Sequence, residues 1–246
     1  MTVLTRPQWL AAMGLDEADV PRLLVLEGSW WQRHRNALRL PALDGARELD
    51  FPELHVGRHQ GVPVLYSCVY GAARAVEPVH IFGQLGTPAV VQIGSCGGLA
   101  AGVVTGDIVV AEQAGIGEGA SQYYGGRGTS AGDSRLAEGA AAAFEARGFR
   151  VHRGSVFTTC ALFAQPPELV ATWRDAGHLA VDMETSAVFS AARCFGMAAT
   201  ALLFVWDELA AGRSFLDTYT PEERRAQERA NLALMDVALA LAPAVA

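Results

Sequence analysis

Short apolar runs alternate with helix-like segments along nearly the whole chain, and the connections between them are short. Apolar runs of about four to eight residues are typical of buried strands, and longer segments that end at a glycine are typical of helices. This alternation predicts a layered α/β fold. We expect strands at 23–26, 62–69, 89–93, 108–111, 151–159 and 200–205, and helices at 73–85, 136–147, 168–175, 183–195 and from Pro221 to about 240.

No shift in composition marks a linker, so residues 1–246 are interpreted as a single domain. Hydrophobic residues make up 51% of the chain and charged residues 18%, which allows a large core and disfavours disorder. The formal net charge is −7 and no stripe of Lys and Arg is present, so we expect neither nucleic acid nor an anionic membrane as a partner.

The expected location is the cytoplasm. No charge-free apolar run reaches about 18 residues, which predicts that no helix spans a membrane. Residues 1–15 hold one arginine and no apolar core, unlike a secretory signal. The four cysteines are widely spaced, which favours free thiols in a reducing compartment; they are Cys68, Cys96, Cys160 and Cys194.

Two histidines four residues apart raise the question of a metal site. His55 and His59 have a spacing that suits a metal on a helix. Their segment, HVGRHQG, contains two glycines and is interpreted as a turn between strands. We therefore predict no metal site and no organic cofactor.

The segment VVQIGSCGGL, residues 90–99, carries an apolar run directly into glycines. Backbone N–H groups at such a strand end can converge on an anion, and the Ser95 hydroxyl can add a donor. A tight turn that needs positive φ explains the same glycines. The segment is neither a Walker motif nor a dinucleotide fingerprint, because GK[ST] and G-x-G-x-x-G are both absent.

Three carboxylates follow apolar runs near the end of the chain. Asp182 and Glu184 flank Met183 where a strand is expected to meet a helix. They can complement the helix dipole, or one can accept hydrogen bonds from both hydroxyls of a ribose. Asp207 ends a buried run, and ligands of open α/β sheets collect beyond the carboxyl ends of strands. Asp207 can protonate a leaving base, or it can cap a helix or lie in a loop.

Taken in order, these segments resemble the nucleoside phosphorylase family, which includes bacterial purine nucleoside phosphorylase and uridine phosphorylase. The matching motifs are GSCGG at 94–98, GD at 106–107, the xMEx pattern at 182–185 and Asp207 at a strand end. The resemblance covers about residues 23–209. It implies a three-layer αβα sandwich around a mixed, partly barrel-like sheet, and a homo-oligomer, either a trimer or a hexamer.

The resemblance also implies roles for individual residues. Asp207 matches the general acid that protonates the purine. The ribose side is matched by Met183, Glu184, Asp182 and the Tyr70–Gly71 loop. The base side is matched by Phe163, and Trp206 is expected to reshape the base pocket. The phosphate side is matched by Gly28, Gly94, Ser95 and Gln92, and Arg33 is taken as a nearby cation.

Two departures from the family pattern concern phosphate. Gln92 and Gln32 stand where the family has arginines. A phosphate dianion needs cationic or amide partners, and two lost charge-assisted contacts cost about 1.5–3 kcal/mol each. Four arginines are candidates to compensate; they are Arg33, Arg35, Arg58 and Arg74.

The leading hypothesis is phosphorolysis of the N-glycosidic bond of a nucleoside, with inorganic phosphate as co-substrate and free base and sugar 1-phosphate as products. Asp207 favours a purine base. One alternative is a nucleosidase in which water replaces phosphate. Another is a non-catalytic nucleoside-binding protein that has lost its phosphate site.

Overall fold

The computed structural model describes residues 4–242. Its strands are Leu23–Gly28 (β1), Asp44–Glu48 (β2), His55–His59 (β3), Val62–Val69 (β4), Ala89–Gly98 (β5), Ile108–Gly117 (β6), Thr129–Ala131 (β7), Val151–Thr159 (β8), Ala180–Asp182 (β9) and Ala198–Asp207 (β10). Its helices are Arg6–Met13 (α1), Gln32–Arg39 (α2), Ala72–Gln84 (α3), Ala120–Tyr123 (α4), Ser134–Glu145 (α5), Pro167–Asp175 (α6), Thr185–Cys194 (α7) and Pro221–Ala240 (α8). Short 3-10 helices lie at Glu17–Asp19, Leu40–Ala42 and Leu209–Ala211.

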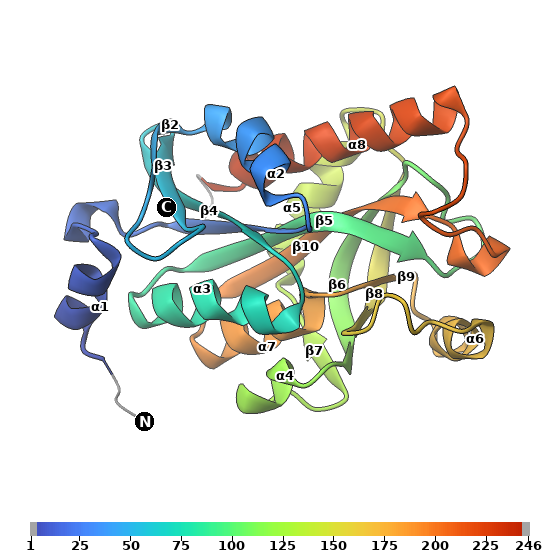
Figure 1. The fold of residues 1–246 in the computed structure, drawn as a ribbon, viewed down its shortest axis with the longest axis horizontal. Helices are drawn as coiled ribbons and strands as arrows, with labels where there is room; N and C mark the ends of the chain where they lie inside the picture. Colours follow the sequence, from blue (N-terminus) through green and yellow to red (C-terminus); the bar gives the residue numbers. More distant parts are fainter. Residues whose placement is uncertain (1–3, 243–246) are drawn as a thin grey trace.

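One mixed sheet organises the molecule (Figure 1). Its strand order is β10-β6-β8-β9-β5-β1-β4-β3-β2, and β7 pairs with β6. Because β10 also pairs with β5, the strands β10, β6, β8, β9 and β5 close into a barrel. Strands β10, β5, β1 and β4 run parallel, whereas β6 runs antiparallel to β10 and β9 runs antiparallel to β5. The mixed, partly barrel-like sheet predicted from the resemblance is confirmed.

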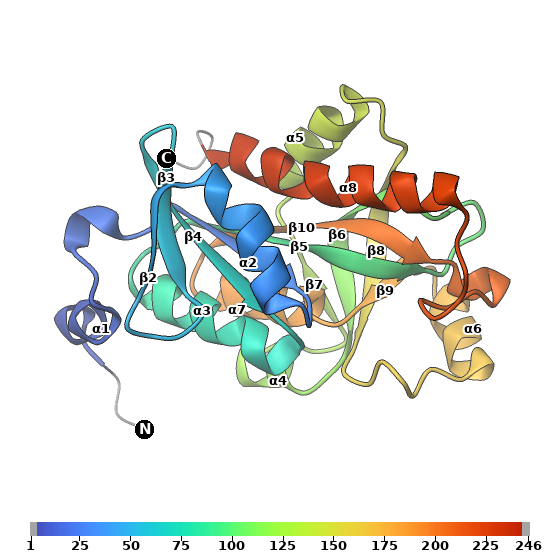
Figure 2. The same cartoon turned by 45° about the horizontal axis from the view of Figure 1, so that its top comes forward.

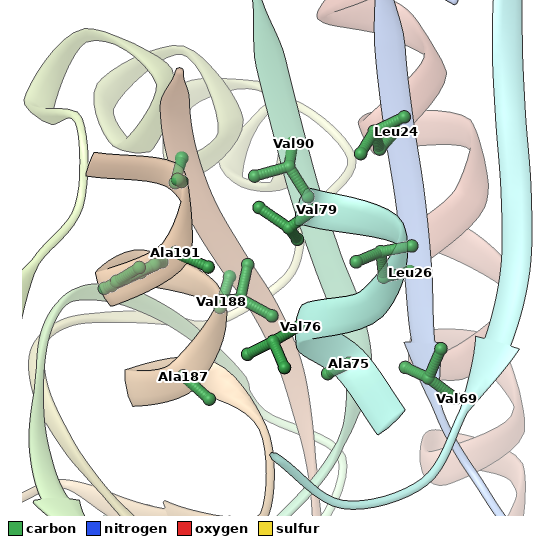
Figure 3. Close-up of a cluster of buried hydrophobic side chains, with 14 of the residues drawn as sticks. Leu24, Leu26, Val69, Ala75, Val76, Val79, Val90, Ala187, Val188 and Ala191 are labelled. Atoms are coloured by element: carbon green, nitrogen blue, oxygen red, sulfur yellow. The ribbon is translucent and has the colours of Figure 1, made fainter. Parts of the chain in front are cut away.

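Helices cover both faces of the sheet and complete the predicted three layers. Helices α3 and α7 lie on one face, and α2, α5 and α8 lie on the other (Figures 1 and 2). Between α3, α7 and the sheet lies a core of fully buried aliphatic side chains, among them Val79, Val188 and Val90 (Figure 3). Each such side chain contributes about 1.5–3 kcal/mol on burial. A second core, with Phe144 and Leu234, lies under α5 and α8.

The long C-terminal helix begins where its sequence predicts. The Thr220 hydroxyl accepts a hydrogen bond from the Glu223 N–H at 3.2 Å, and the Glu223 carboxylate accepts one from the Thr220 N–H at 2.7 Å. Pro221 occupies the first helical turn, where a missing N–H costs nothing. This capping box determines the residue at which α8 begins.

The glycine cluster at the end of β5 differs from one of the two expectations. The strand continues through Gly94, Gly97 and Gly98, none of which has positive φ, so the tight-turn interpretation is wrong. The neighbours on each side explain the difference. β1 pairs with β5 as far as Gly94, β10 pairs with it as far as Gly97, and β9 pairs with Gly97 and Gly98, so neighbouring strands hold the backbone extended through the whole cluster.

The histidine pair also differs from expectation. Residues 55–59 form β3, paired with β4, and the turn is confined to Gln60 and Gly61, whose φ angles are 50° and 81°. Gly57 suits the strand because a Cβ there would lie 2.9 Å from Leu43 Cβ. Four residues along a strand span about 13 Å, which is too far for His55 and His59 to share a metal ion.

Candidate active site

The site lies at the carboxyl ends of β1, β5 and β10, where two glycines bring the backbones close together. Gly28 ends β1 and pairs with Gly94 of β5. A Cβ on Gly28 would lie 2.7 Å from Cδ of Glu184, and a Cβ on Gly94 would lie 3.3 Å from the Gly28 carbonyl oxygen. A side chain on Gly28 would therefore displace Glu184, which is held directly against the strand end, and Gly94 is tightly packed.

The predicted ribose-side residues come together. Glu184 is 4% exposed, and its Oε1 accepts a hydrogen bond from the Gly71 N–H at 2.7 Å. The Tyr70 hydroxyl donates to the sulfur of Met183 at 3.2 Å. Burial, with the nearby Asp182 carboxylate, raises the pKa of Glu184 to about 8, and the Gly71 N–H acts against that rise. The Tyr70–Gly71 loop and the Met183–Glu184 pair thus form one wall of the site.

Asp182 has a different position from the one implied by the resemblance. Its Oδ2 accepts hydrogen bonds from the backbone N–H groups of Glu184 at 3.2 Å and Thr185 at 2.8 Å, and its Oδ1 accepts one from the Thr158 hydroxyl at 2.7 Å. Asp182 therefore caps the start of α7, as the helix-dipole alternative anticipated. Its oxygens are occupied within the chain, so it positions Glu184 rather than facing a ribose.

Asp207 ends β10 as a nearly buried carboxyl group, 7% exposed. Burial raises its pKa to about 7, against the backbone N–H groups of Phe215 and of Asp207 itself. A Cβ on Gly97 would lie 3.1 Å from Asp207 Oδ1, so the absence of a side chain on β5 makes room for the carboxyl group. With this pKa, Asp207 holds a proton in about half the molecules at neutral pH and can donate it.

Four aromatic rings, here called the aromatic group, gather from four loops beside Asp207. Trp30 lies 5.0 Å from Tyr70, 6.0 Å from Phe163 in a stacked arrangement, and 6.4 Å from Phe215, measured between ring centroids. Phe163 is 78% exposed and Trp30 is 44% exposed. Because the Phe215 N–H also contacts Asp207, the group adjoins the acid, and its rings offer flat apolar surfaces for a base.

Trp206 does not belong to the aromatic group. Its ring contacts Phe204 at 5.8 Å and packs against the core under α8. Its carbonyl oxygen accepts a hydrogen bond from the Gln227 side chain at 2.8 Å. The base-pocket role predicted for Trp206 conflicts with this position, because alternation along β10 directs its side chain into the core.

The phosphate-side residues lie around Gly28 and Gly94. Ser95 is the single exposed residue of β5, whose other nine residues are buried. Gln92 is fully buried; its Oε1 accepts a hydrogen bond from the Thr185 hydroxyl at 2.7 Å, and its Nε2 has no partner among residues 4–242. Gln32 makes a long contact of 3.5 Å with the Cys68 carbonyl. Arg33 lies exposed on α2.

Three residues of the site were not predicted from the sequence. Trp30 and Phe215 belong to the aromatic group, and Ser29 follows Gly28 at the end of β1. The signal available for Trp30 was its position two residues after the glycine of the first loop, because aromatic residues next to a ligand loop are often exposed. Phe215 lies in an irregular segment with no periodicity to place it.

Residues 4–242 contain no cluster of three or more His, Cys, Asp or Glu side chains placed to hold a metal ion. Within the same range no helix has the length and hydropathy needed to cross a membrane.

The sequence profile of the phosphorylase superfamily matches residues 45–241, which include β3 to β10 and all of α8. The chain belongs to the phosphorylase superfamily. This membership confirms the predicted family, and the chain is an enzyme of the pentosyltransferase type.

Curated members of the superfamily are similar over much of the chain. A purine nucleoside phosphorylase of the DeoD type from Myxococcus xanthus is 30% identical over 190 residues, which cover 74% of this chain and 78% of that protein. A guanosine phosphorylase from Halorubrum lacusprofundi is 32% identical over 143 residues, covering 58% of this chain and 59% of that protein. A uridine phosphorylase structure from Vibrio fischeri aligns with a TM-score of 0.78 at 20% identity over 97% of each chain, which supports the fold.

Proposed function

We propose that the protein cleaves the N-glycosidic bond of a purine nucleoside by phosphorolysis, releasing the free base and a sugar 1-phosphate. The observation that carries the proposal is Asp207, a nearly buried acid with a pKa of about 7 at a strand end beside the aromatic group. A base that leaves as an anion needs a proton donor, and a group titrating near neutrality supplies one efficiently. The purine and guanosine phosphorylases similar to this chain support the choice of base.

The ribose is assigned to the wall formed by Met183, Glu184 and Tyr70. The Glu184 carboxylate lies beside Gly28 and accepts hydrogen bonds readily, so it suits the paired hydroxyls of a sugar. Met183 offers a soft apolar surface to the ring. The base is assigned to the aromatic group, with Phe163 and Trp30 on its faces. This arrangement directs the base toward Asp207.

In the reaction, the bond between the anomeric carbon and the base nitrogen breaks, and its electron pair goes to the base. Asp207 transfers its proton to the base as that charge develops, and a phosphate oxygen forms the new bond to the anomeric carbon. The transition state carries positive charge on the sugar. Negative charge on phosphate stabilises that cation more strongly than the neutral substrate, which is the condition for catalysis. The Glu184 oxygens accept hydrogen bonds from the ribose hydroxyls.

A nucleosidase is the second candidate, and a specific observation favours it. Gln92 and Gln32 bring neutral amides to the two positions where a guanidinium was expected, and the Gln92 side chain is fully buried. A neutral amide binds a phosphate dianion more weakly than a guanidinium does. Water would then replace phosphate as the group that bonds to the anomeric carbon, and Asp207 would protonate the leaving base as before.

The decisive experiment measures release of free base from inosine, guanosine, adenosine, methylthioadenosine and uridine, with and without inorganic phosphate. Phosphorolysis predicts release from a purine nucleoside only when phosphate is present, with sugar 1-phosphate formed in equal amount. Equal release in both buffers would identify a nucleosidase. Calorimetric binding of a nucleoside with no release would identify a non-catalytic binding protein. A trimer or hexamer and a cytoplasmic location stay predictions.

A further inference from the structure

A buried cluster of one carboxylate and two guanidinium groups lies on the α2 and α8 side of β1, next to Gly28. Glu27 is 1% exposed and accepts hydrogen bonds from Arg39 Nε at 3.0 Å, from Arg39 Nη2 at 2.9 Å and from the Tyr66 hydroxyl at 2.8 Å. Arg39 also donates to Asn231 of α8 at 2.8 Å. Arg39 therefore pairs fully with the one carboxylate of the cluster.

A second guanidinium, that of Arg35, lies beside the same carboxylate without a good partner. Arg35 is 8% exposed, and its Nε is 3.4 Å from Glu27 Oε1 and 3.4 Å from the Ser29 hydroxyl. A single N–H is shared between these two acceptors, and both distances are at the limit for a hydrogen bond, so each contact is weak. Its terminal amino groups donate no hydrogen bond within residues 4–242. Glu53, a further nearby carboxylate, is bonded to Asn36.

Two guanidinium groups thus face one fully buried carboxylate, and the Arg35 guanidinium keeps N–H donors that no acceptor within residues 4–242 takes up. A charge removed from water without a partner is costly, and an anion that enters beside it removes that cost. The structure therefore holds a cation ready for an anionic ligand, even though neither Gln92 nor Gln32 supplies one.

The Arg35 guanidinium lies next to the predicted phosphate residues. Gly28 pairs with Gly94, so Ser29 follows beside Ser95. Residues two apart on a strand share a face, as do register partners on neighbouring parallel strands, so Glu27, Ser29 and Ser95 lie on the face where Arg39 joins Glu27 to α8. Helices α2 and α8 cover this face of the sheet (Figure 2). Ser95 is exposed in an otherwise buried strand, so this face is open at that point. The Ser29 hydroxyl also accepts the Trp31 N–H at 3.2 Å, at the start of α2.

The other candidate arginines have different surroundings. Arg58 donates to Asp19 at 2.6 Å and to the Gly61 carbonyl at 2.9 Å, at the far end of β3. Arg74 pairs with Glu77 and donates to the Pro52 carbonyl at 3.0 Å. Arg33 is exposed on α2.

We propose that Arg35, with Ser29, supplies the cationic phosphate contact that Gln92 and Gln32 do not. The proposal rests on phosphorolysis as the function and adds the residue that selects phosphate over water. The anion would take one guanidinium edge of Arg35 and the hydroxyls of Ser29 and Ser95, and Arg39 would keep Glu27 neutralised. Removing this cation would weaken the affinity for phosphate more than the affinity for the nucleoside.

The test measures binding of inorganic phosphate to the purified protein by calorimetry, in a buffer without other multivalent anions. We expect Arg35→Gln to weaken the Kd for phosphate at least tenfold, Arg35→Lys to restore part of the loss, and Ser29→Ala to weaken it several-fold. Arg225→Gln, which removes one surface charge from α8, is the matched control and is expected to leave the Kd unchanged. In kinetics, Arg35→Gln should raise the KM for phosphate and leave the KM for the nucleoside nearly constant.

The inference is overturned if the wild-type protein binds no phosphate, or if the Kd of Arg35→Gln equals that of wild type. It is also overturned if Arg33→Gln weakens phosphate binding and Arg35→Gln does not. If Arg35→Gln fails to fold, the Kd of Ser29→Ala for phosphate tests the inference instead. Phosphate-dependent base release that survives Arg35→Gln refutes only this inference, whereas base release independent of phosphate refutes the proposed function.

Discussion

Replacing Asp207 by Asn removes the transferable proton while keeping the size of the side chain. Burial raises the pKa of Asp207 from 3.8 to about 7. At pH 7 about half the molecules then carry the proton, against about one in 1,600 for an unshifted carboxyl group, so the fold enriches the acid form about 10³-fold. General acids contribute about 10²–10⁴-fold to rate. We therefore expect Asp207→Asn to lower kcat/KM by about that factor.

The pH dependence supplies the sharper measurement. Wild-type kcat/KM should fall about tenfold per pH unit above about pH 7, because Asp207 loses its proton there. The residual rate of Asp207→Asn should not show that fall. Inorganic phosphate changes its own protonation in the same range, so the diagnostic quantity is the ratio of the two rates at each pH. A ratio that stays constant from pH 5 to pH 9 would refute the role of Asp207 as the acid.

The same variant has an expected effect on stability, with a definite sign. The folded pKa of Asp207 lies above the unfolded value, so the folded state keeps a proton that the unfolded chain releases. Stability is therefore lost as the pH rises from about 4 to about 7, by at most about 4 kcal/mol for a shift of about three units. Asp207→Asn should not show that loss. Its urea midpoint, measured relative to that of wild type at the same pH, should therefore be higher at pH 8 than at pH 4. An equal difference at both pH values would show that the carboxyl group is not buried as described.

Three further predictions concern the ribose wall, the end of β1 and the buried ion pair beside it. Glu184→Gln should raise the KM for the nucleoside and lower kcat/KM at least about tenfold, since the amide replaces one of the two oxygens that accept hydrogen bonds from the ribose; unchanged steady-state constants would remove Glu184 from the site. Gly28→Ala should place a methyl group against the Glu184 carboxylate and destabilise the fold by about 1–3 kcal/mol; a thermal unfolding midpoint equal to that of wild type would contradict the close packing. Arg39→Met should leave Glu27 buried with Arg35 as its remaining cation, whose Nε lies 3.4 Å away, and should cost about 3–5 kcal/mol in urea unfolding, whereas the surface change Arg225→Gln should cost less than about 0.5 kcal/mol; similar values for the two variants would show that the ion pair is dispensable.

Local patterns determined most of the secondary structure. The strand Val151–Thr159 and the helix from Pro221 to Ala240 lie where β-branched residues and a capping box predict them. Both signals act within a few residues and depend little on the rest of the chain. The family, and with it the barrel-like sheet, could be predicted because GSCGG and the xMEx pattern occur in a characteristic order.

Elements that depend on distant partners were missed or misjudged. Residues 55–61 looked like a turn because Gly57 and Gly61 are poor strand formers, yet β4 supplies the hydrogen bonds of His55–His59. The glycines of β5 are extended because β1, β10 and β9 pair with them along the strand. Propensity is a weak signal there, and pairing with strands far along the chain overrides it.

The site divides in the same way. The residue types of Glu184, Asp207 and Ser95 in their order indicated a nucleoside site from the sequence alone. Only the tertiary structure assigned Asp182 to the cap of α7 and placed Arg35 against Glu27 and Ser29. Hydrogen bonds and burial depend on distances between segments far apart in the chain, and burial is what moves the Asp207 pKa toward neutrality.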